Sequence, residues 1–192
     1  MYETTNGTIH AIIGGYLDGS IFVYEFNDHA KLSHYKLLGT LSSAVSCLCY
    51  SVLNKLIFAG SISGLIASFA NSGNDKWIKK KEMNNFGSKI QSMNLSDELA
   101  LLITGDVAGN ITIHRLSIKL ELVKIINVRI PIDYLNLFIS PVAGFILFSS
   151  NSGKFESFSI NGFKMGEFSD PVQIIDSPVL GKDSSFNNHL VF

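Results

Sequence analysis

The 192-residue chain is 46% hydrophobic and only 16% charged, so it can bury a core, and its apolar surplus indicates that some of its surface is covered by something outside the chain. Its formal net charge of −1 gives no overall field that would recruit nucleic acid, which is therefore not an expected partner. The first ten residues lack the basic and apolar regions of a secretory signal, and no apolar stretch approaches the ~20 residues that a membrane-spanning helix needs. We expect a cytoplasmic protein without a transmembrane segment, for which peripheral association with a membrane stays open.

Four glycines recur along the chain at intervals of 45, 45 and 44 residues: Gly19, Gly64, Gly109 and Gly153. Each follows a short apolar run and a small or polar pair, and each precedes a run that alternates in polarity. This context is typical of a tight turn between two β-strands, where glycine tolerates a positive φ. A second set of residues has nearly the same spacing, and each of them opens a further predicted strand: Val45, Ile90, Ile132 and Val172.

The best-formed unit, residues 89–128, shows how one period divides into strands. KIQSMNLS alternates, LALLIT is a continuous apolar run as in a strand covered on both faces, NITIHRL alternates again, and ELVKIINV carries the charges of an outer strand. The same pattern predicts strands at 45–50, 55–60, 65–70, 77–83, 132–139, 145–149, 154–160 and 163–168. No segment has a convincing helical period.

A period of roughly 40–50 residues with about four strands in each unit is typical of a β-propeller. We therefore predict an all-β fold, a partial propeller of about four blades, each of four antiparallel strands, with a period of about 40–45 residues. The whole chain forms one partial propeller with the approximate units 1–39, 40–83, 84–128, 129–168 and 169–192.

The units resemble WD repeats. The stretch from Asp18 to Tyr24, DGSIFVY, is similar to the family's Asp-Gly-x-x-x-x-Trp pattern. The later units depart from that pattern, because Ser63, Ala108 and Ser152 replace the aspartate, and Phe69, His114 and Phe158 replace the tryptophan. The resemblance therefore implies degenerate blades that lack the family's Asp–His–Ser–Trp network and are held mainly by apolar packing. His114 is expected to be a packed or hydrogen-bonded imidazole.

A second resemblance concerns the C-terminal part of the chain. SFSINGFKMGEF (157–168), after the strands within 45–60, is similar to the last blades of BEACH-domain proteins. Asn161-Gly162 is also the strongest generic signal for a hairpin turn, so turn chemistry alone is an alternative explanation. The resemblance implies a role in membrane trafficking.

Both terminal units read as incomplete. Residues 9–15 resemble the second strand of a blade with no inner strand before it, and residues 188–192 resemble the beginning of another second strand. We therefore expect a propeller cut in mid-blade at both ends, as in a fragment or a truncated gene product. Its uncovered faces would begin near Ile9–Ile13 and Val172–Ile175, and missing blades, a partner protein or a four-blade closure would complete it.

Signals for chemistry are few. Cys47 and Cys49, the only cysteines, lie two apart on a predicted strand, where a disulfide would be strained and a zinc site would lack further ligands. We expect buried structural thiols and a reducing compartment. The adjacent Asp97 and Glu98 are expected in a solvated turn, and the five histidines have no metal spacing. No nucleophile elbow or phosphate loop is present, so we expect no catalytic residue, metal, cofactor or small-molecule substrate.

One local cluster is a candidate binding site: Lys76, Trp77, Lys79, Lys80 and Lys81. An aromatic ring beside four lysines can dock on phosphates, nucleic acid or an acidic peptide. The alternative is an outer strand whose lysines protect an exposed sheet edge while Trp77 and Ile78 pack inward.

Two functional hypotheses follow. The first is a non-catalytic scaffold that binds other proteins, and by resemblance part of a BEACH-type protein in membrane trafficking. The alternative is a propeller segment of an assembly that binds RNA or phospholipid through the lysine-rich strand at 76–81. Salt-sensitive binding to RNA or anionic liposomes would indicate the second hypothesis, and salt-insensitive protein association the first.

Overall fold

The computed structural model describes residues 2–3, 9–26, 29, 31–72, 76–132, 134–139, 144–149, 154–169, 179–182 and 188–191. Every regular element in these ranges is a β-strand, and among them there is no helix of the length and apolarity required to cross a membrane. The strands form four antiparallel sheets of four strands and one pair of strands. The predicted all-β class is confirmed.

The sheets follow one another along the chain, and within each sheet the spatial order of the strands is the chain order. The first sheet contains β1 (Tyr2–Glu3), β2 (Ile9–Gly15), β3 (Ser20–Phe26) and β4 (Leu32–Thr40). The second contains β5 (Val45–Ser51), β6 (Leu56–Ser61), β7 (Leu65–Asn71) and β8 (Trp77–Asn84). The third contains β9 (Ile90–Ser96), β10 (Leu101–Asp106), β11 (Asn110–Arg115) and β12 (Leu122–Asn127). The fourth contains β13 (Tyr134–Ile139), β14 (Gly144–Ser149), β15 (Lys154–Ser159) and β16 (Lys164–Ser169).

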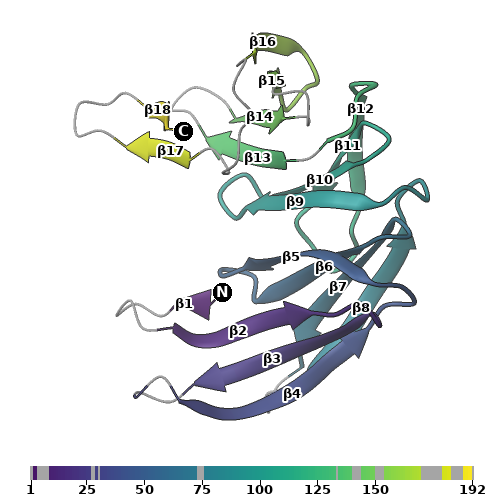
Figure 1. Ribbon diagram of the computed structural model, residues 1–192, viewed down its shortest axis with the longest axis vertical. Coiled ribbons are helices and arrows are strands. Elements are labelled where there is room, and N and C mark those ends of the chain that lie inside the picture. Colours follow the sequence, from purple (N-terminus) through teal and green to yellow (C-terminus); the bar gives the residue numbers. More distant parts are fainter. Residues whose placement is uncertain are drawn as a thin grey trace.

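These four sheets are the blades of a partial propeller, arranged along an open arc (Figure 1). For β2 and for the strands of the second, third and fourth sheets, the boundaries agree with the predicted ranges to within about two residues, the usual uncertainty of strand ends. The remaining pair is β17 (Val179–Lys182) with β18 (Asn188–Val191), and β18 coincides with the strand predicted near the C-terminal end.

In the first three sheets the recurring glycine lies in the turn between the second and third strands. Gly19, Gly64 and Gly109 have φ angles of 86°, 81° and 86°, a conformation that other residues adopt only with strain. Each glycine carbonyl accepts a hydrogen bond from the residue that follows the outer strand of its sheet: Leu41 N (2.9 Å), Asn85 N (2.7 Å) and Val128 N (2.8 Å). The turn therefore also holds in place the backbone that directly follows the outer strand. The predicted turn at Gly153 and the predicted strand at Val172 lie outside the described residues.

The first sheet has one strand more than predicted, because no strand was expected before residue 9. The two-residue strand β1 pairs with β2, with Tyr2 opposite Ala11 and Glu3 opposite Ile9. Such a short strand has no alternating pattern by which a sequence could reveal it. Whether the units are cut in mid-blade stays a prediction.

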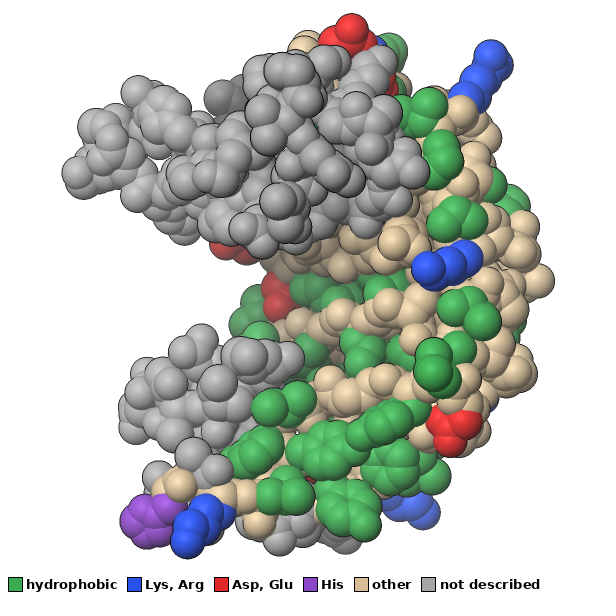
Figure 2. Space-filling model, viewed as in Figure 1, with side chains coloured by type: hydrophobic (Ala, Val, Ile, Leu, Met, Phe, Trp, Pro, Cys, Tyr) green, Lys and Arg blue, Asp and Glu red, His purple; other side chains and the backbone are tan. Residues whose placement is uncertain are grey.

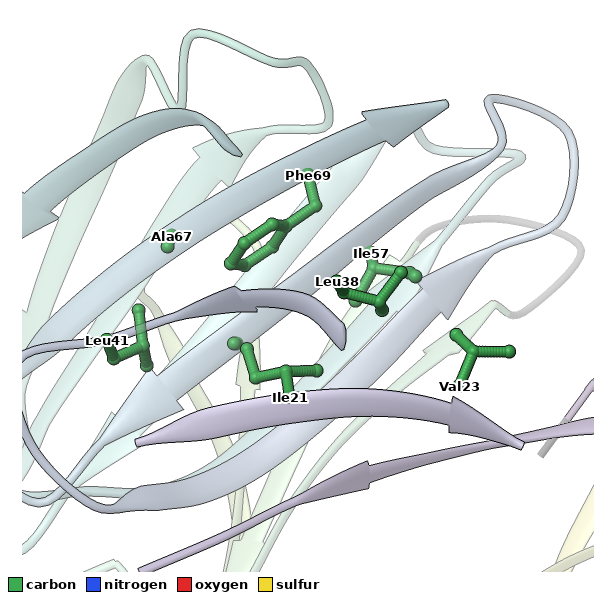
Figure 3. Close-up of a cluster of buried hydrophobic side chains, with 8 residues drawn as sticks. Ile21, Val23, Leu38, Leu41, Ile57, Ala67 and Phe69 are labelled. Atoms are coloured by element: carbon green, nitrogen blue, oxygen red, sulfur yellow. The ribbon is translucent and has the colours of Figure 1, made fainter. Parts of the chain in front are cut away.

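The apolar core lies between consecutive sheets. Figure 3 shows the first of these layers, in which side chains of the first sheet and the residue after it meet side chains of the second sheet. Its members are Ile21, Val23, Leu38, Leu41, Ile57, Ala59, Ala67 and Phe69. Similar layers separate the second sheet from the third and the third from the fourth. All six residues of β6 are buried, as the continuous apolar run predicts.

A buried polar network adds to the predicted apolar packing where the second sheet meets the third. The amide Nδ2 of Asn85 donates to Oγ1 of Thr104 (3.2 Å) and of Thr112 (3.1 Å), and these two hydroxyls lie 2.6 Å apart. His114 bonds through Nε2 to Thr112 (3.0 Å) and through Nδ1 to the carbonyl of Leu120 (3.3 Å). His114 therefore is the hydrogen-bonded imidazole that the sequence predicted.

Candidate protein-interaction surface

The side of the first sheet that faces away from the second sheet is apolar. Ile21 and Val23 of β3 point toward the second sheet, so the alternating residues Phe22 and Tyr24 lie on the opposite face. We call this face the aromatic face and define it by Ile12, Tyr16, Phe22, Tyr24, Tyr35 and Leu37. The relative exposures of Tyr35 and Leu37 are 63% and 53%. Hydrophobic side chains gather on the surface where Figure 1 places β2–β4 (Figure 2).

Ring contacts join the aromatic residues into one cluster. The centroid of Phe22 lies 5.6 Å from that of Tyr16, edge to face, and 6.1 Å from that of Tyr35. Tyr24 stacks on Tyr35 at a centroid distance of 6.0 Å. The hydroxyls of Tyr16 and Tyr24 are hydrogen-bonded to each other, and this bond raises the pKa of Tyr24. The cluster therefore presents a preorganised, uncharged surface on which these two hydroxyls are already paired.

The other repeats show that the position of Tyr24 is normally covered. Counting from the turn glycines, Tyr24 corresponds to Phe69 in the second sheet and to His114 in the third. Phe69 and His114 have no exposed surface, whereas Tyr24 is only half-buried. The aromatic face thus has the composition of a contact surface between sheets, but no other sheet among the described residues covers it. This agrees with the sequence expectation of an uncovered face near Ile9–Ile13.

The lysine-rich strand, the predicted candidate site, is β8 at the outer edge of the second sheet. Trp77 packs inward, with its ring edge to face with Tyr50 at 6.5 Å. Lys79 donates from Nζ to the carbonyl of Thr40 (3.0 Å) and pairs with Glu82 (2.5 Å). The remaining three lysines of the site are exposed: Lys76, Lys80 and Lys81. Ile78 was also expected to pack inward but is 37% exposed, because successive residues of a strand point to opposite faces. The arrangement of Trp77 and the lysines is the one expected of a protected sheet edge, and the binding role stays a prediction.

The two cysteines are free and partly buried. Burial raises the pKa of the Cys47 thiol to about 11 and raises the pKa of Cys49 as well. Both thiols are therefore protonated at neutral pH and poorly nucleophilic. Within the described ranges, no three His, Cys, Asp or Glu side chains are grouped as metal ligands would be.

Asp97 connects two sheets, although the sequence placed it in a solvated turn. It follows β9 of the third sheet, and its carboxylate accepts hydrogen bonds from the turn between β5 and β6 of the second. The donors are the Ser51 hydroxyl, the backbone amides of Val52 (3.1 Å) and Leu53 (3.4 Å), and Asn54 Nδ2 (3.2 Å). The Asp97 carboxylate therefore links the third sheet to the second through hydrogen bonds.

Sequence reasoning did not identify the aromatic face as a specific surface. Tyr24 occupies the tryptophan position of the repeat, and that position alone indicates a packing residue. The sequence FVY at 22–24 could have revealed the aromatic face, because it puts two rings on one side of a strand. The same positions in the next unit hold Ala67 and Phe69, which is only one ring.

Comparison with known proteins supports the fold. No protein-family model matches the chain, and no curated protein matches it in sequence. The chain is similar in structure to the computationally designed Ika8 protein, with a TM-score of 0.68 and 14% identity over 95% of this chain and 55% of that one. It is also similar to a chain of the mitotic checkpoint complex, with a TM-score of 0.66 and 12% identity over 83% of this chain and 46% of that one. It spans about half the length of each.

Proposed function

We propose that this chain is a non-catalytic protein-interaction module that binds another polypeptide through its aromatic face. The observation that carries the proposal is the partial exposure of Phe22 and Tyr24 in the middle strand of the first sheet. The residues at the same repeat positions in the second and third sheets are fully buried: Ala67, Phe69, Thr112 and His114. Contiguous apolar surface of this kind typically marks an interaction site, and tyrosine is enriched at the centres of such sites.

The properties of the aromatic face favour a protein over a charged ligand. None of its six side chains carries a charge at neutral pH, so the hydrophobic effect rather than Coulomb attraction would drive binding. A structure of similar fold belongs to the mitotic checkpoint complex, which supports a role in protein assembly by analogy of fold. The inward packing of Trp77 and the engagement of Lys79 give the RNA or phospholipid alternative no comparable support.

Within this proposal, the likeness of residues 157–168 to BEACH-domain proteins assigns the module to a cytoplasmic protein of membrane trafficking. The free thiols of Cys47 and Cys49 are compatible with a reducing compartment. Genomic sequence around this chain tests the assignment directly. A BEACH-like domain encoded upstream supports it. Its absence would assign Asn161-Gly162 to turn chemistry alone, consistent with the positive φ of Gly162.

The interaction proposal is tested by placing a photo-crosslinking phenylalanine derivative at Tyr35 and expressing the chain in its native cells. We expect one dominant crosslinked polypeptide. The matched control carries the same probe at Leu53, a 76% exposed residue in the turn between β5 and β6. Identical crosslinked products from the two positions, or none from Tyr35, would refute the proposal.

A further inference from the structure

We propose that β12, the outer strand of the third sheet, is a second docking site, to which a partner polypeptide adds an extended segment that carries acidic side chains. The added segment pairs with the free edge of β12 and extends the third sheet by one strand, a mode of recognition known as β-strand addition. The site is separate from the aromatic face, which belongs to the first sheet.

The edge of β12 that faces away from β11 has no strand beside it in the part of the chain that the structure describes. β12 is the last strand in the order of its sheet and lies at the outer side of the arc (Figure 1). Residues 124–127 pair one to one with residues 110–113, and one extra residue, Val123, interrupts the register before them. The regular edge that can accept a strand is therefore 124–127.

The hydrogen bonds to β11 identify the backbone groups of β12 that point outward. The amide of Val128 donates to the carbonyl of the turn glycine opposite it (2.8 Å), so this position is bonded toward β11. Bonded positions alternate in an antiparallel pair, so the backbone groups of Ile126 and Lys124 also face β11. The amides and carbonyls of Ile125 and Asn127 therefore point away from the sheet, where they can bond to an added strand.

The side chains beside this edge are apolar. Leu122, Val123 and Ile125 are 43–56% exposed. The equivalent outer strand of the second sheet, β8, has three consecutive lysines at 79–81, and charges of this kind resist pairing at a sheet edge. β12 contains a single lysine. It therefore lacks that protection and offers aliphatic side chains that an added strand can cover.

The charges around β12 favour an acidic segment. Residues 115–129 contain four basic residues and one acidic residue, although the formal net charge of the whole chain is −1. The acidic residue, Glu121, is paired with Arg115 (3.4 Å). The other basic residues are all exposed: Lys119, Lys124 and Arg129. Their positive charge attracts acidic side chains on an incoming strand and repels basic ones.

The same charges disfavour a second copy of this chain as the occupant. Pairing of β12 with β12 would bring the basic residues of two copies together, and like charges on neighbouring strands destabilise a sheet. A nucleic acid would meet the positive charge but would leave the backbone groups of Ile125 and Asn127 without strand partners. An extended acidic polypeptide matches the backbone, the aliphatic side chains and the charge together.

The test uses a synthetic peptide of about seven residues, a typical strand length, in which glutamate alternates with valine. Amide exchange is followed by NMR at each residue of β12. We expect the peptide to slow the exchange of Ile125 and Asn127 at least about tenfold, while Lys124 and Ile126, already bonded to β11, change little. Raising the salt concentration from about 0.05 M to about 0.5 M should weaken binding at least about threefold. The control peptide is N-methylated at its central residues, which removes donors from both of its edges, and it should not bind.

A pair of variants tests the outward amide of Ile125. Ile125→Pro removes this amide but leaves the pairing with β11, because proline is tolerated at an edge position whose N–H faces solvent. It should weaken binding of the peptide at least about tenfold, since a hydrogen bond is lost and the ring obstructs the incoming backbone. Ile125→Val keeps the amide and should bind within about twofold of the parent. Circular dichroism checks that both variants fold, and the exchange measurement on the parent chain needs neither of them.

Three results would overturn the proposal: unchanged exchange of Ile125 and Asn127 at the highest peptide concentration, equal binding of the N-methylated peptide, or equal binding to folded Ile125→Pro and Ile125→Val. Two others would replace the occupant. Protection of these amides that grows with the concentration of the chain alone would assign the edge to a second copy. Tighter binding of a uridine oligonucleotide than of the peptide, unaffected by Ile125→Pro, would assign the basic residues to nucleic acid.

Discussion

A Cβ atom on Gly105 would lie 2.6 Å from Cγ2 of Ile132, the apolar residue that precedes the first strand of the next sheet. Two further close approaches join the other described sheets, each between the second strand of one sheet and the first residue of the next: Gly15 with Val45 (2.4 Å to Cγ1) and Gly60 with Ile90 (2.9 Å to Cγ2). In each case, a glycine near the end of the second strand packs against the residue at or just before the first strand of the next sheet. These residues belong to the second periodic set of the sequence, so the contacts between sheets recur with the same period as the sequence.

Gly105→Ala is expected to destabilise the chain by about 1–3 kcal/mol, because the added methyl group overlaps Ile132 in a close-packed junction. Urea unfolding followed by tryptophan fluorescence or circular dichroism measures the change. Gly166→Ala is the matched control, since its Cβ would meet Ser157 Oγ at an ordinary 3.5 Å. Equal urea midpoints for the two variants would contradict the packing argument.

Much of the fold could be predicted because the signals of the repeat are local. The glycine that needs a positive φ and the alternating run after it recur at each turn, and each marks one hairpin. The strand β1 was not predicted because two residues carry no periodicity. The hydrogen-bond network from Asn85 to His114 was not predicted either, because Asn85 and Thr112 lie 27 positions apart in sequence and meet only across sheets.

The sequence predicted the candidate site less well than the fold. The lysines beside Trp77 led to the prediction of a binding strand, but in the structure the Trp77 ring packs inward against Tyr50. The aromatic face depends on which side of β3 lacks a neighbouring sheet. Tyr24 and Phe69 are equivalent in the repeat, and only the three-dimensional arrangement shows that one is covered and the other is not.

His114 is expected to make stability depend on pH. Burial lowers its pKa below the ordinary 6.5, so the unfolded chain binds a proton more readily than the folded chain. The free energy of unfolding should therefore fall as pH decreases from about 6.5 toward the lower folded pKa, and should gain nothing from this residue above that range. Urea unfolding of the wild type and of His114→Gln between about pH 5 and 8, a range set by ordinary histidine titration, isolates the effect. Parallel pH profiles would contradict it.

The combined variant Lys79→Ala, Lys80→Ala and Lys81→Ala is expected to lower stability by no more than about 1 kcal/mol, because exposed strand charges contribute little. Lys79 bonds to Thr40 and Glu82 at the surface of the molecule, where water replaces such partners at small cost. Thermal unfolding measures stability, and titration with RNA or anionic vesicles at two salt concentrations measures binding. Tight, salt-sensitive binding by the parent that is abolished in the variant would restore the alternative function of this strand.

The isolated 192-residue chain is expected to self-associate as its concentration rises. Repeat stability is largely a sum of interfaces between neighbours, and the aromatic face with Tyr35 and Leu37 has no covering sheet among the described residues. Exposed apolar faces of this kind promote aggregation, so sedimentation velocity should show a broad, open-ended distribution rather than one discrete dimer.

Tyr35→Lys together with Leu37→Lys should shift that distribution toward monomer, because charges on the face oppose its burial. Leu53→Lys, at an exposed residue outside the aromatic face, is the control and should leave association unchanged. Adding flanking blades should also restore the monomer, since a covering sheet removes the exposed apolar surface. A compact, monodisperse monomer of the unmodified chain with a sharp cooperative melt would show that the arc closes by itself, and the expectation of an uncovered face would be wrong.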